Sequence, residues 1–305
     1  MDRDAFAPAS TARPLIFGEV LFDRFPDGSA VLGGAPFNVA WHLQAFGMEP
    51  LFVSSVGADL LGEQVLHAMR EWGMDLSGLQ TDTCHPTGVV DVSFSQGEPH
   101  YHIVSDSAWD HISYQRLPAL STLPGCLLYH GSLALRQVVS RTAWQRLNEQ
   151  TSVLRFIDIN LRDPWWAGEA IGQLLAGARW LKLNADELAQ IVPQFRDIEG
   201  RIHHLLETLS LAWLIITRGE TGALAVSAEG ERLQVIPEHE VRVVDTVGAG
   251  DAFSSVLIVG LLKGWPMEQT LRCAQHFAGS VVGLRGATNR DRDFYQPFIE
   301  AWQLT

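Results

Sequence analysis

The stretch DTVGAGDAF at residues 245–253 is the feature that most constrains the fold of this chain. An alternating run at residues 239–244 precedes it, and a long apolar run at residues 252–262 follows it. This order predicts a strand, a glycine loop and a buried helix. Because Gly248 and Gly250 carry no Cβ, they allow the backbone to turn with a positive φ and to approach another group closely.

The same stretch predicts an anion site that contains an acidic residue. The first N–H groups of a helix have no partner inside the helix and carry the positive end of its dipole, so they suit a phosphate group. A carboxylate at Asp251 would weaken ground-state phosphate binding, unless it accepts a proton from a nucleophile that attacks the phosphate. We therefore predict that Asp251 is a catalytic base. The loop residues whose amides would neutralise developing charge are Gly248, Ala249 and Gly250.

Two other interpretations of this stretch stay open at the level of the sequence. Asp commonly caps a helix and glycine commonly makes a tight turn, so an isolated GAGD favours a structural role. The dinucleotide fingerprint also combines a strand, a GxG loop and a helix. In this chain, however, Phe253 occupies the position of its third glycine, and no second strand with an acidic ribose ligand follows at the right distance.

A second stretch, LGGAPFNVAWHLQAFG at residues 32–47, shows which family the chain resembles. It is similar to the N-terminal signature of the ribokinase-like (pfkB) carbohydrate kinases and, through GGAP followed by NVA, to the fructokinase branch. DTVGAGDAF resembles the C-terminal signature of the same family. The resemblance implies an α/β chain with a three-layer αβα ribokinase-like fold and a small β-sheet lid. It also implies transfer of the γ-phosphoryl group of MgATP to a primary sugar hydroxyl.

Fructose is the leading acceptor that the resemblance implies. Ribose, 2-keto-3-deoxygluconate and nucleosides are served by similar motifs, and a few pocket residues can exchange such acceptors. A catalytically silent sugar-sensing homologue is the alternative of a different class. The intact Asp251 and its glycines favour the enzyme.

The chain is long enough for a sizeable core, and its apolar, strand-sized runs alternate with helix-length segments. We expect one kinase domain over residues 14–305, preceded by a disordered tail at residues 1–13. The family resemblance places lid strands at about residues 20–32 and 87–105. The second of these segments alternates apolar and polar residues on both sides of a turn at residues 96–99, which predicts a β-hairpin.

Composition limits the partners and the compartment. A net charge of −13 argues against surfaces for nucleic acid or anionic membranes, since both require basic patches. The N-terminal residues lack the apolar core of a signal peptide and no run approaches the length of a membrane span, so we expect a cytoplasmic protein. Widely spaced cysteines, odd in number, predict reduced thiols: Cys84, Cys126 and Cys273. The expected partners are a small sugar and ATP, with a homodimer through the lid strands as the resemblance implies.

The sugar ligands are expected at the ends of two strands and at the start of a helix. Residues 15–23 predict one central parallel strand that delivers Glu19 and Asp23 to the edge where open α/β sheets bind ligands. Asp23 can also be a turn residue ahead of residues 25–28. Asn38 lies in the first turn of a predicted helix, where its amide can donate and accept. The family resemblance implies that the sugar is held by Asp23, Gly33, Gly34, Asn38 and Arg162.

The nucleotide is expected at the ends of later strands. NADEL at residues 184–188 resembles the NxxE element of the family, in which Asn184 and Glu187 organise water around magnesium and the phosphates. Oxygen ligands suit Mg²⁺, but a helix cap with Glu in the first turn gives the same pattern. The further nucleotide contacts that the resemblance implies are Thr217, Gly219, Gly222 and Gln275.

The resemblance also implies a monovalent cation, K⁺, held by backbone carbonyls of the loop at residues 284–288 and of residues near the start of the glycine loop. The metal contacts expected for the two cations together are Glu187, Asp245, Val247 and Gly286. Three residues depart from the small residue or Asn that the family often carries near the adenine, which leaves the nucleotide preference open: Gln275, His276 and Phe277.

Overall fold

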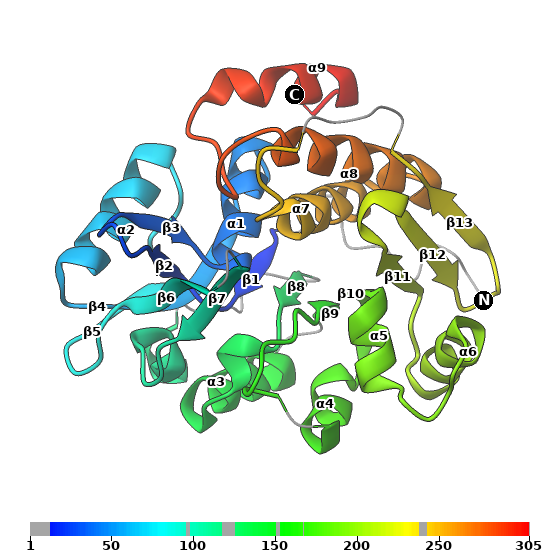
Figure 1. Ribbon diagram of the computed structural model, residues 1–305, viewed down its shortest axis with the longest axis horizontal. Coiled ribbons are helices and arrows are strands. Elements are labelled where there is room, and N and C mark those ends of the chain that lie inside the picture. The colour runs from blue at the N-terminus through cyan, green and yellow to red at the C-terminus, as the bar shows by residue number, and fades with distance from the viewer. Residues whose placement is uncertain are drawn as a thin grey trace.

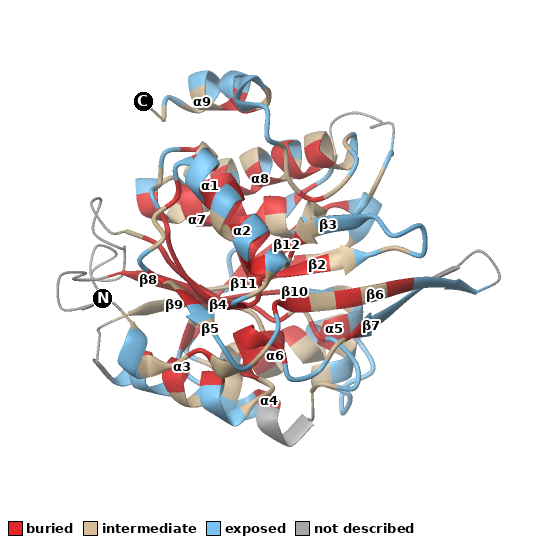
Figure 2. Ribbon diagram, turned by 90° about the vertical axis from the view of Figure 1, so that its left-hand side faces the viewer, coloured by how far each residue is buried: buried red, intermediate tan, exposed pale blue. Residues whose placement is uncertain are grey.

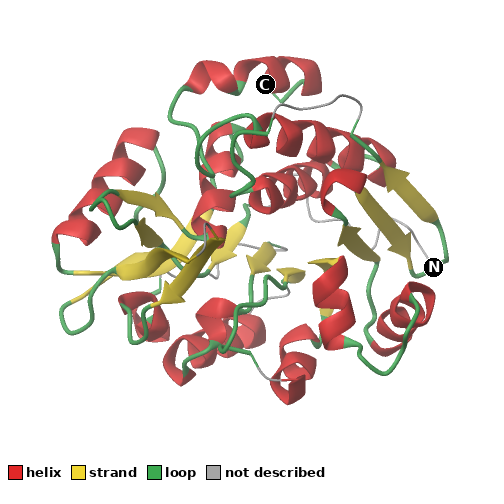
Figure 3. Cartoon of the chain, viewed as in Figure 1, coloured by secondary structure: helices red, strands yellow, loops and turns green. Residues whose placement is uncertain are grey.

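The computed structural model describes residues 13–95, 98–117, 126–150, 153–166, 168–237 and 243–304. In this part of the chain, helices cover both faces of a large sheet with the strand order β13-β12-β11-β10-β9-β8-β1-β4-β5 (Figures 1 and 3). The predicted three-layer αβα fold is confirmed. The single-domain organisation over residues 14–305 stays a prediction.

The large sheet is parallel from β11 to β5, and β12 runs antiparallel to both of its neighbours. The strands between its two edges are mostly apolar, because both faces of the sheet are covered there. The strands are β1 Leu15–Phe17, β4 Leu51–Gly57, β5 Leu79–Asp82, β8 Leu127–His130, β9 Leu154–Asp158, β10 Ala178–Asn184, β11 Trp213–Thr217, β12 Ala223–Ser227 and β13 Arg232–Val235.

Two groups of helices make the outer layers. One face of the sheet packs with α1, α2, α7 and α8 around one large apolar cluster, and the other face packs with α3 to α6 around two further clusters. Figure 2 shows the two groups above and below the sheet. The helices are α1 Ala35–Ala45, α2 Leu60–Trp72, α3 Val138–Gln150, α4 Gly168–Leu175, α5 Ala185–Ile191, α6 Ile198–Thr208, α7 Ala249–Lys263, α8 Met267–Val282 and α9 Gln296–Trp302.

A second, smaller sheet has the strand order β3-β2-β6-β7 and is called the small sheet below. Its strands are β2 Leu21–Arg24, β3 Ala30–Gly33, β6 Gly88–Ser95 and β7 Glu98–Ile103. These strands confirm the predicted β-sheet lid and the hairpin, although turn residues 96–97 lie outside the described residues. β6 begins buried and ends exposed, so its far end projects away from the body of the protein (Figure 2).

The prediction of one strand over residues 15–23 was wrong. The chain forms β1 in the large sheet, leaves it at Gly18, and forms β2 in the small sheet. A Cβ on Gly18 would overlap the ring of Pro36, so only glycine lets helix α1 approach the chain here. The break places Glu19 between the two sheets and Asp23 on the small one.

The strand predicted before the glycine loop is not found where the structure describes the chain. Residues 239–242 lie outside the described residues, and Val243 and Val244 belong to no strand. Instead, the backbone N–H groups of Val244 and Asp245 both donate to the carbonyl of Val282 at the end of α8, at 3.0 and 3.2 Å. Val243 and Val244 are 64 and 54% exposed, so these two residues do not form part of a buried strand.

Two features of the structure bear on the compartment. Among the described residues, no helix is long and apolar enough to cross a membrane. The three cysteines are unpaired, with Cys126 buried and Cys84 exposed. The cytoplasmic location stays a prediction.

Candidate active site

Asp251 lies in the first turn of α7, three residues after the glycine that caps the start of this helix. Gly248 is the N-cap residue, with φ 81° and ψ −4°, a left-handed conformation that favours glycine. A Cβ at this position would also overlap Ala287 of the loop that follows α8. Gly248 therefore lets the start of α7 pack against that loop, and the first-turn N–H groups of α7 stay at the same end of the helix as the Asp251 carboxylate.

A hydrogen bond joins the two family signatures. Asn38 Nδ2 donates to Asp251 Oδ2 at 2.8 Å. Asn38 is buried in the first turn of α1, whose N-cap is Gly34 with φ 109°. A Cβ on Gly34 would lie 2.7 Å from the carbonyl oxygen of Glu19, so glycine is required for this close approach. The position of Asn38 thus depends on the segment between β1 and β2, where the chain passes from the large sheet to the small sheet.

Two of the predicted sugar ligands, Asp23 and Asn38, lie on the same side of Gly33. A Cβ on Gly33 would lie 3.7 Å from Asp23 Oδ2 and 3.9 Å from Asn38 Oδ1, so both oxygens lie beside the bare glycine backbone. Asn38 Oδ1 is buried and has no hydrogen-bond partner in the described structure. A buried polar atom normally finds a partner, and a hydroxyl group of a ligand can supply one here.

Three carboxyl groups with raised pKa values gather at this end of the large sheet. Burial raises the pKa of Asp251 to about 7, against opposing hydrogen bonding from Asn38. Burial likewise raises the pKa of Glu19 to about 7 and that of Asp23 to about 6. The positive charge of Arg162 lowers all three pKa values, so the exposed Arg162 lies near each of them. Pairs of strongly perturbed acids are typical of functional sites.

Beneath Asp251 lies a buried network that the sequence analysis missed. Asp158 Oδ2 accepts hydrogen bonds from Lys182 Nζ at 2.8 Å, Ser254 Oγ at 2.6 Å and Tyr129 OH at 3.2 Å. We call these four residues the Asp158 network. A Cβ on Gly250 would lie 3.6 Å from Lys182 Nζ, so the ammonium group lies under the glycine loop. The only sequence signal was a charged residue inside each of two apolar strand runs.

Asn184 and Glu187 form the helix cap that the sequence left open. Asn184 Oδ1 accepts from the Glu187 N–H, and Glu187 Oε2 accepts from the Asn184 N–H, both at 2.8 Å. Glu187 Oε1 accepts from the Leu161 N–H at 2.8 Å, which ties the start of α5 to the segment that leads to Arg162. The pattern therefore has a structural role, and its contact with magnesium stays a prediction.

Thr217 ends β11, next to the strand that ends at Asn184, so both lie at the same edge of the sheet. Gly219 and Gly222 have φ values of 55° and 86°, and a Cβ on Gly222 would overlap the Val235 carbonyl. These glycines make the predicted tight loop after β11. Their contact with a nucleotide stays a prediction.

The residues around Gln275 separate into two groups. Phe277 is fully buried and its ring packs with His42, Phe46 and Phe298. Phe277 is therefore a core residue. Gln275 is partly exposed and His276 is exposed on α8, so neither is a core residue. The contact of Gln275 with a nucleotide stays a prediction.

Asp245 joins the two loops that were predicted to hold a monovalent cation. Its Oδ1 accepts from the Val247 N–H and its Oδ2 from the Gly286 N–H, each at 3.0 Å. The carboxylate thus organises both loops through backbone amides. Cation binding by the neighbouring carbonyls stays a prediction.

These motifs belong to a known family over nearly the whole chain. Residues 11–293 match the pattern of a protein family described as "pfkB family carbohydrate kinase". The chain belongs to this family. The family and its relatives make this protein a carbohydrate kinase and confirm the expectation drawn from the two signatures.

Several members of the pfkB family are similar to this kinase over most of its length. A fructokinase from Salmonella typhimurium is 29% identical over 297 residues, which cover 90% of this chain and 95% of the relative. An aminoimidazole riboside kinase from Salmonella typhimurium is 31% identical over 242 residues, covering 76% and 74%. The crystal structure of aminoimidazole riboside kinase from Salmonella enterica, with aminoimidazole riboside and an ATP analogue, has a TM-score of 0.79 at 26% identity and covers 93% of this chain and 99% of that chain.

Proposed function

We propose that this pfkB-family kinase transfers the γ-phosphoryl group of MgATP to a primary hydroxyl of a sugar, with fructose as the leading acceptor. The observation that carries the proposal is the hydrogen bond between Asn38 and Asp251 at the start of α7. It puts a predicted sugar ligand and a predicted base in direct contact. ATP as the donor is supported by the ATP analogue in the riboside kinase structure.

In the proposed reaction, Asp251 accepts the proton of the attacking hydroxyl group. A base of this kind works best with a pKa near the working pH, and burial raises the pKa of Asp251 to about 7. The N–H groups of Gly248, Ala249 and Gly250 would neutralise charge on the transferring phosphoryl group, helped by the dipole of α7. The Ala249 N–H group also donates to the Thr246 carbonyl, at 3.3 Å. Most of the rate enhancement would come from positioning the two reactants in line.

The sugar would be oriented by Asp23, Asn38 and Arg162 and by the bare backbone of Gly33 and Gly34. Asn38 already donates to Asp251, so its unpartnered Oδ1 is the atom left to accept from a sugar hydroxyl. Within the described part of the chain, the exposed Arg162 guanidinium donates to the carbonyl of Leu161 through Nη1, at 3.1 Å, which leaves its other N–H groups for a ligand. Its planar fork suits vicinal hydroxyls or a phosphoryl group.

The cations in this proposal act on the phosphates. When bound with ATP, Mg²⁺ would offset phosphate charge, and it usually keeps several waters. Both oxygens of Glu187 accept a backbone hydrogen bond, but each keeps a second lone pair for a metal-bound water. For K⁺, the backbone around Asp245, Val247 and Gly286 is the proposed site, because the Asp245 carboxylate already holds these two loops together.

Two alternatives concern the acceptor and the class of protein. An aminoimidazole riboside kinase is as similar in sequence as the fructokinases, which favours a riboside as the second acceptor to test. Ribose and 2-keto-3-deoxygluconate are further acceptors of similar size and polarity. A catalytically silent sugar sensor would bind the sugar without turnover.

The deciding experiment is an ADP-release screen of the purified enzyme with MgATP over fructose, ribose, 2-keto-3-deoxygluconate, aminoimidazole riboside and other nucleosides. We expect fructose to give the highest kcat/KM. Higher kcat/KM for a riboside would replace fructose as the substrate. Sugar binding in calorimetry without any ADP release would replace the enzyme by the sensor.

We also infer a homodimer through the small sheet. Val31, Phe94 and Tyr101 are 44, 58 and 57% exposed on its strands. Strand register places Asp23 between Val31 and Val90, so this face continues from the predicted sugar ligand. Light scattering should give the mass of a dimer for the wild type and of a monomer for Phe94→Glu. Leu60→Glu, at a still more exposed apolar position on α2, is the control and should stay dimeric.

A further inference from the structure

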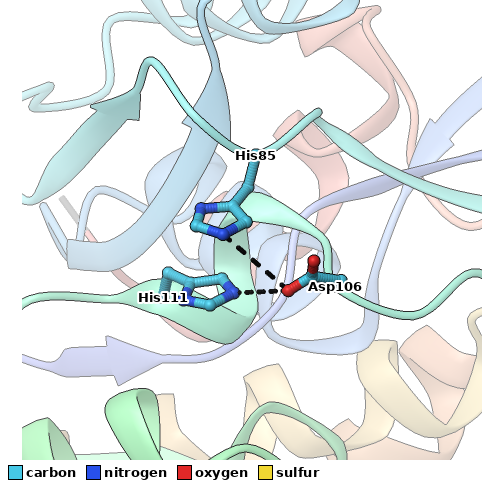
Figure 4. Close-up of side chains that lie close together, drawn as sticks. All are labelled: His85, Asp106 and His111. Carbon is cyan, nitrogen blue, oxygen red and sulfur yellow. Dashed lines mark hydrogen bonds and ion pairs between the residues drawn. The ribbon is translucent and has the colours of Figure 1, made fainter.

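A cluster of two histidines and one aspartate lies among residues that the proposed reaction does not use. His111 Nε2 lies 2.8 Å from Asp106 Oδ1, and His85 Nε2 lies 3.8 Å from the same oxygen. The two imidazole rings stack with centroids 3.5 Å apart and an interplanar angle of 7°. Figure 4 shows both rings turned toward the one carboxylate. One ligand atom of each residue lies within 4.8 Å of the other two.

The three residues come from separate segments at the base of the β6–β7 hairpin. His85 lies between β5 and β6, Asp106 follows β7, and His111 is the last residue of the short helix Ala108–His111. Asp106 has a φ of 59°, in the left-handed region that Asp and Asn tolerate better than most residues. Its side chain is 72% exposed, whereas the two histidine side chains are 25 and 23% exposed. The cluster is therefore anchored on one side and open to solvent on the other.

A second carboxylate, that of Asp82, fixes which ring nitrogen of His85 carries the hydrogen. Asp82 Oδ2 lies 3.0 Å from His85 Nδ1, and Asp82 Oδ1 accepts from the backbone N–H groups of Cys84 and His85 at 2.7 and 3.1 Å. An ionised carboxylate only accepts, so Nδ1 must carry the hydrogen. This is the arrangement in which metal-binding histidines are usually held by a second carboxylate.

The arrangement leaves two electron-rich atoms facing each other. With its hydrogen on Nδ1, neutral His85 has a lone pair on Nε2, and this lone pair faces the negatively charged Asp106 Oδ1 at 3.8 Å. His111 can donate to the same oxygen from Nε2, but this one N–H group leaves the lone pair of His85 Nε2 without a donor. A cation between the three atoms removes the repulsion. Either a proton on His85 or a metal ion can be that cation.

We propose that His85, Asp106 and His111 bind one divalent transition-metal ion, Zn²⁺, through the two Nε2 atoms and Oδ1. Two imidazoles and one carboxylate suit zinc, and the exposed side of the cluster leaves room for water as the remaining ligand. On binding, neutral His111 changes tautomer through solvent, losing its hydrogen from Nε2 and gaining one on Nδ1, so that the Nε2 lone pair faces the ion.

Zinc at this place would tie together the two ends of the β6–β7 hairpin. The segments before β6 and after β7 would then share one ion, which limits how far the small sheet can move relative to β5. Binding to the folded state alone also raises the unfolding temperature with metal concentration. The inference is independent of the acceptor sugar, because none of its residues is a predicted sugar or nucleotide ligand.

The test is calorimetric titration of the untagged, metal-free full chain with zinc chloride, followed by Co²⁺ as a spectroscopic probe of the coordination. We expect one ion per chain at neutral pH and a rise in unfolding temperature with zinc. Asp106→Asn keeps the size of the side chain and tolerates the positive φ, and it should weaken binding by about 10-fold to 100-fold. His111→Gln should weaken zinc binding to a similar extent. Without metal, both variants should unfold cooperatively at a temperature close to that of the metal-free wild type.

His203→Ala is the matched control. His203 Nε2 lies 3.0 Å from Glu207 Oε1 one turn away on α6, an exposed histidine–carboxylate pair without a second histidine. It should leave zinc binding unchanged. Equal zinc affinity in the wild type and Asp106→Asn would overturn the proposal. So would a wild type that binds no zinc and only titrates protons at the cluster, which would show that a proton is the cation there.

Discussion

Asn38 and Asp251 are 213 positions apart in the sequence, and the amide of the first donates to the carboxylate of the second at 2.8 Å. The hydrogen bond stabilises the ionised carboxylate, while burial favours its protonated form. The balance leaves a base that is ionised only above about pH 7. The first two of the following predictions concern this carboxylate.

Asp251→Asn should lower kcat by about a hundredfold to ten-thousandfold, because the amide cannot accept the proton of the attacking hydroxyl. The sugar dissociation constant should change by less than about tenfold, or about 1.4 kcal/mol, because the side chain keeps its size. Steady-state ADP release and calorimetry measure the two effects. Glu268→Gln, an exposed acid in the first turn of α8, is the control and should keep full activity.

Asn38→Ala should shift the acidic limb of the pH profile to higher pH. The base is active when deprotonated, so kcat/KM rises through the pKa of Asp251, which is about 7 in the wild type. Loss of a donor to a charged acceptor raises that pKa by about one unit or more. The profile of kcat/KM against pH measures the shift. The control is Asn148→Ala, which removes an amide that donates to a helix carbonyl and should leave the acidic limb in place. An acidic limb that does not move in Asn38→Ala would contradict the hydrogen bond from Asn38 to Asp251.

Glu19→Gln should change how stability depends on pH. Burial raises the pKa of Glu19 from 4.5 to about 7 in the folded protein. A carboxyl group with a raised pKa adds stability that is fully present below pH 4.5 and is lost as the pH rises through about 7. Its ionisation thus costs the wild type on the order of 3 kcal/mol at alkaline pH. Urea unfolding at acid and alkaline pH should show a smaller loss for the variant; equal losses would exclude a titrating Glu19.

Lys182→Met should destabilise the protein by about 3–5 kcal/mol, because it leaves the buried Asp158 carboxylate without its cation. The double variant Lys182→Met with Asp158→Asn should recover part of that free energy of unfolding, since neither charge is then left alone. Urea unfolding of the wild type, both single variants and the double variant measures the coupling. Additive losses would show that the ion pair at 2.8 Å contributes nothing to folding.

Gly248→Ala should destabilise the protein and reduce activity more than Gly264→Ala does. Both glycines flank α7 and have left-handed φ values, 81° and 67°. A Cβ on Gly264 meets nothing within 4 Å, whereas one on Gly248 overlaps Ala287. Gly264→Ala thus measures the backbone cost alone, about 1–2 kcal/mol. Unfolding temperatures and kcat of the two variants separate that cost from the contact with Ala287.

Local patterns determined the parts of this protein that depend on neighbours in the sequence. The apolar run after the glycine loop predicts a helix that is buried all round, and α7 is such a helix. The alternation in residues 87–105 predicts a hairpin, and β6 pairs with β7. The two signatures, read together, indicated the family and its fold. Each of these features rests on period, turn chemistry or residue identity within a short window.

Tertiary structure decided what depends on residues that are far apart in the chain. The close approach of Pro36 to Gly18 divides one apolar run between two sheets, and no pattern within the run shows it. Lys182 and Ser254 meet at Asp158 only because α7 crosses the ends of neighbouring strands. His85 and His111 stack because two loops meet below a hairpin. Sequence period fixes which face of an element is apolar, but only packing fixes which polar groups share a buried space and shift each other's proton affinity.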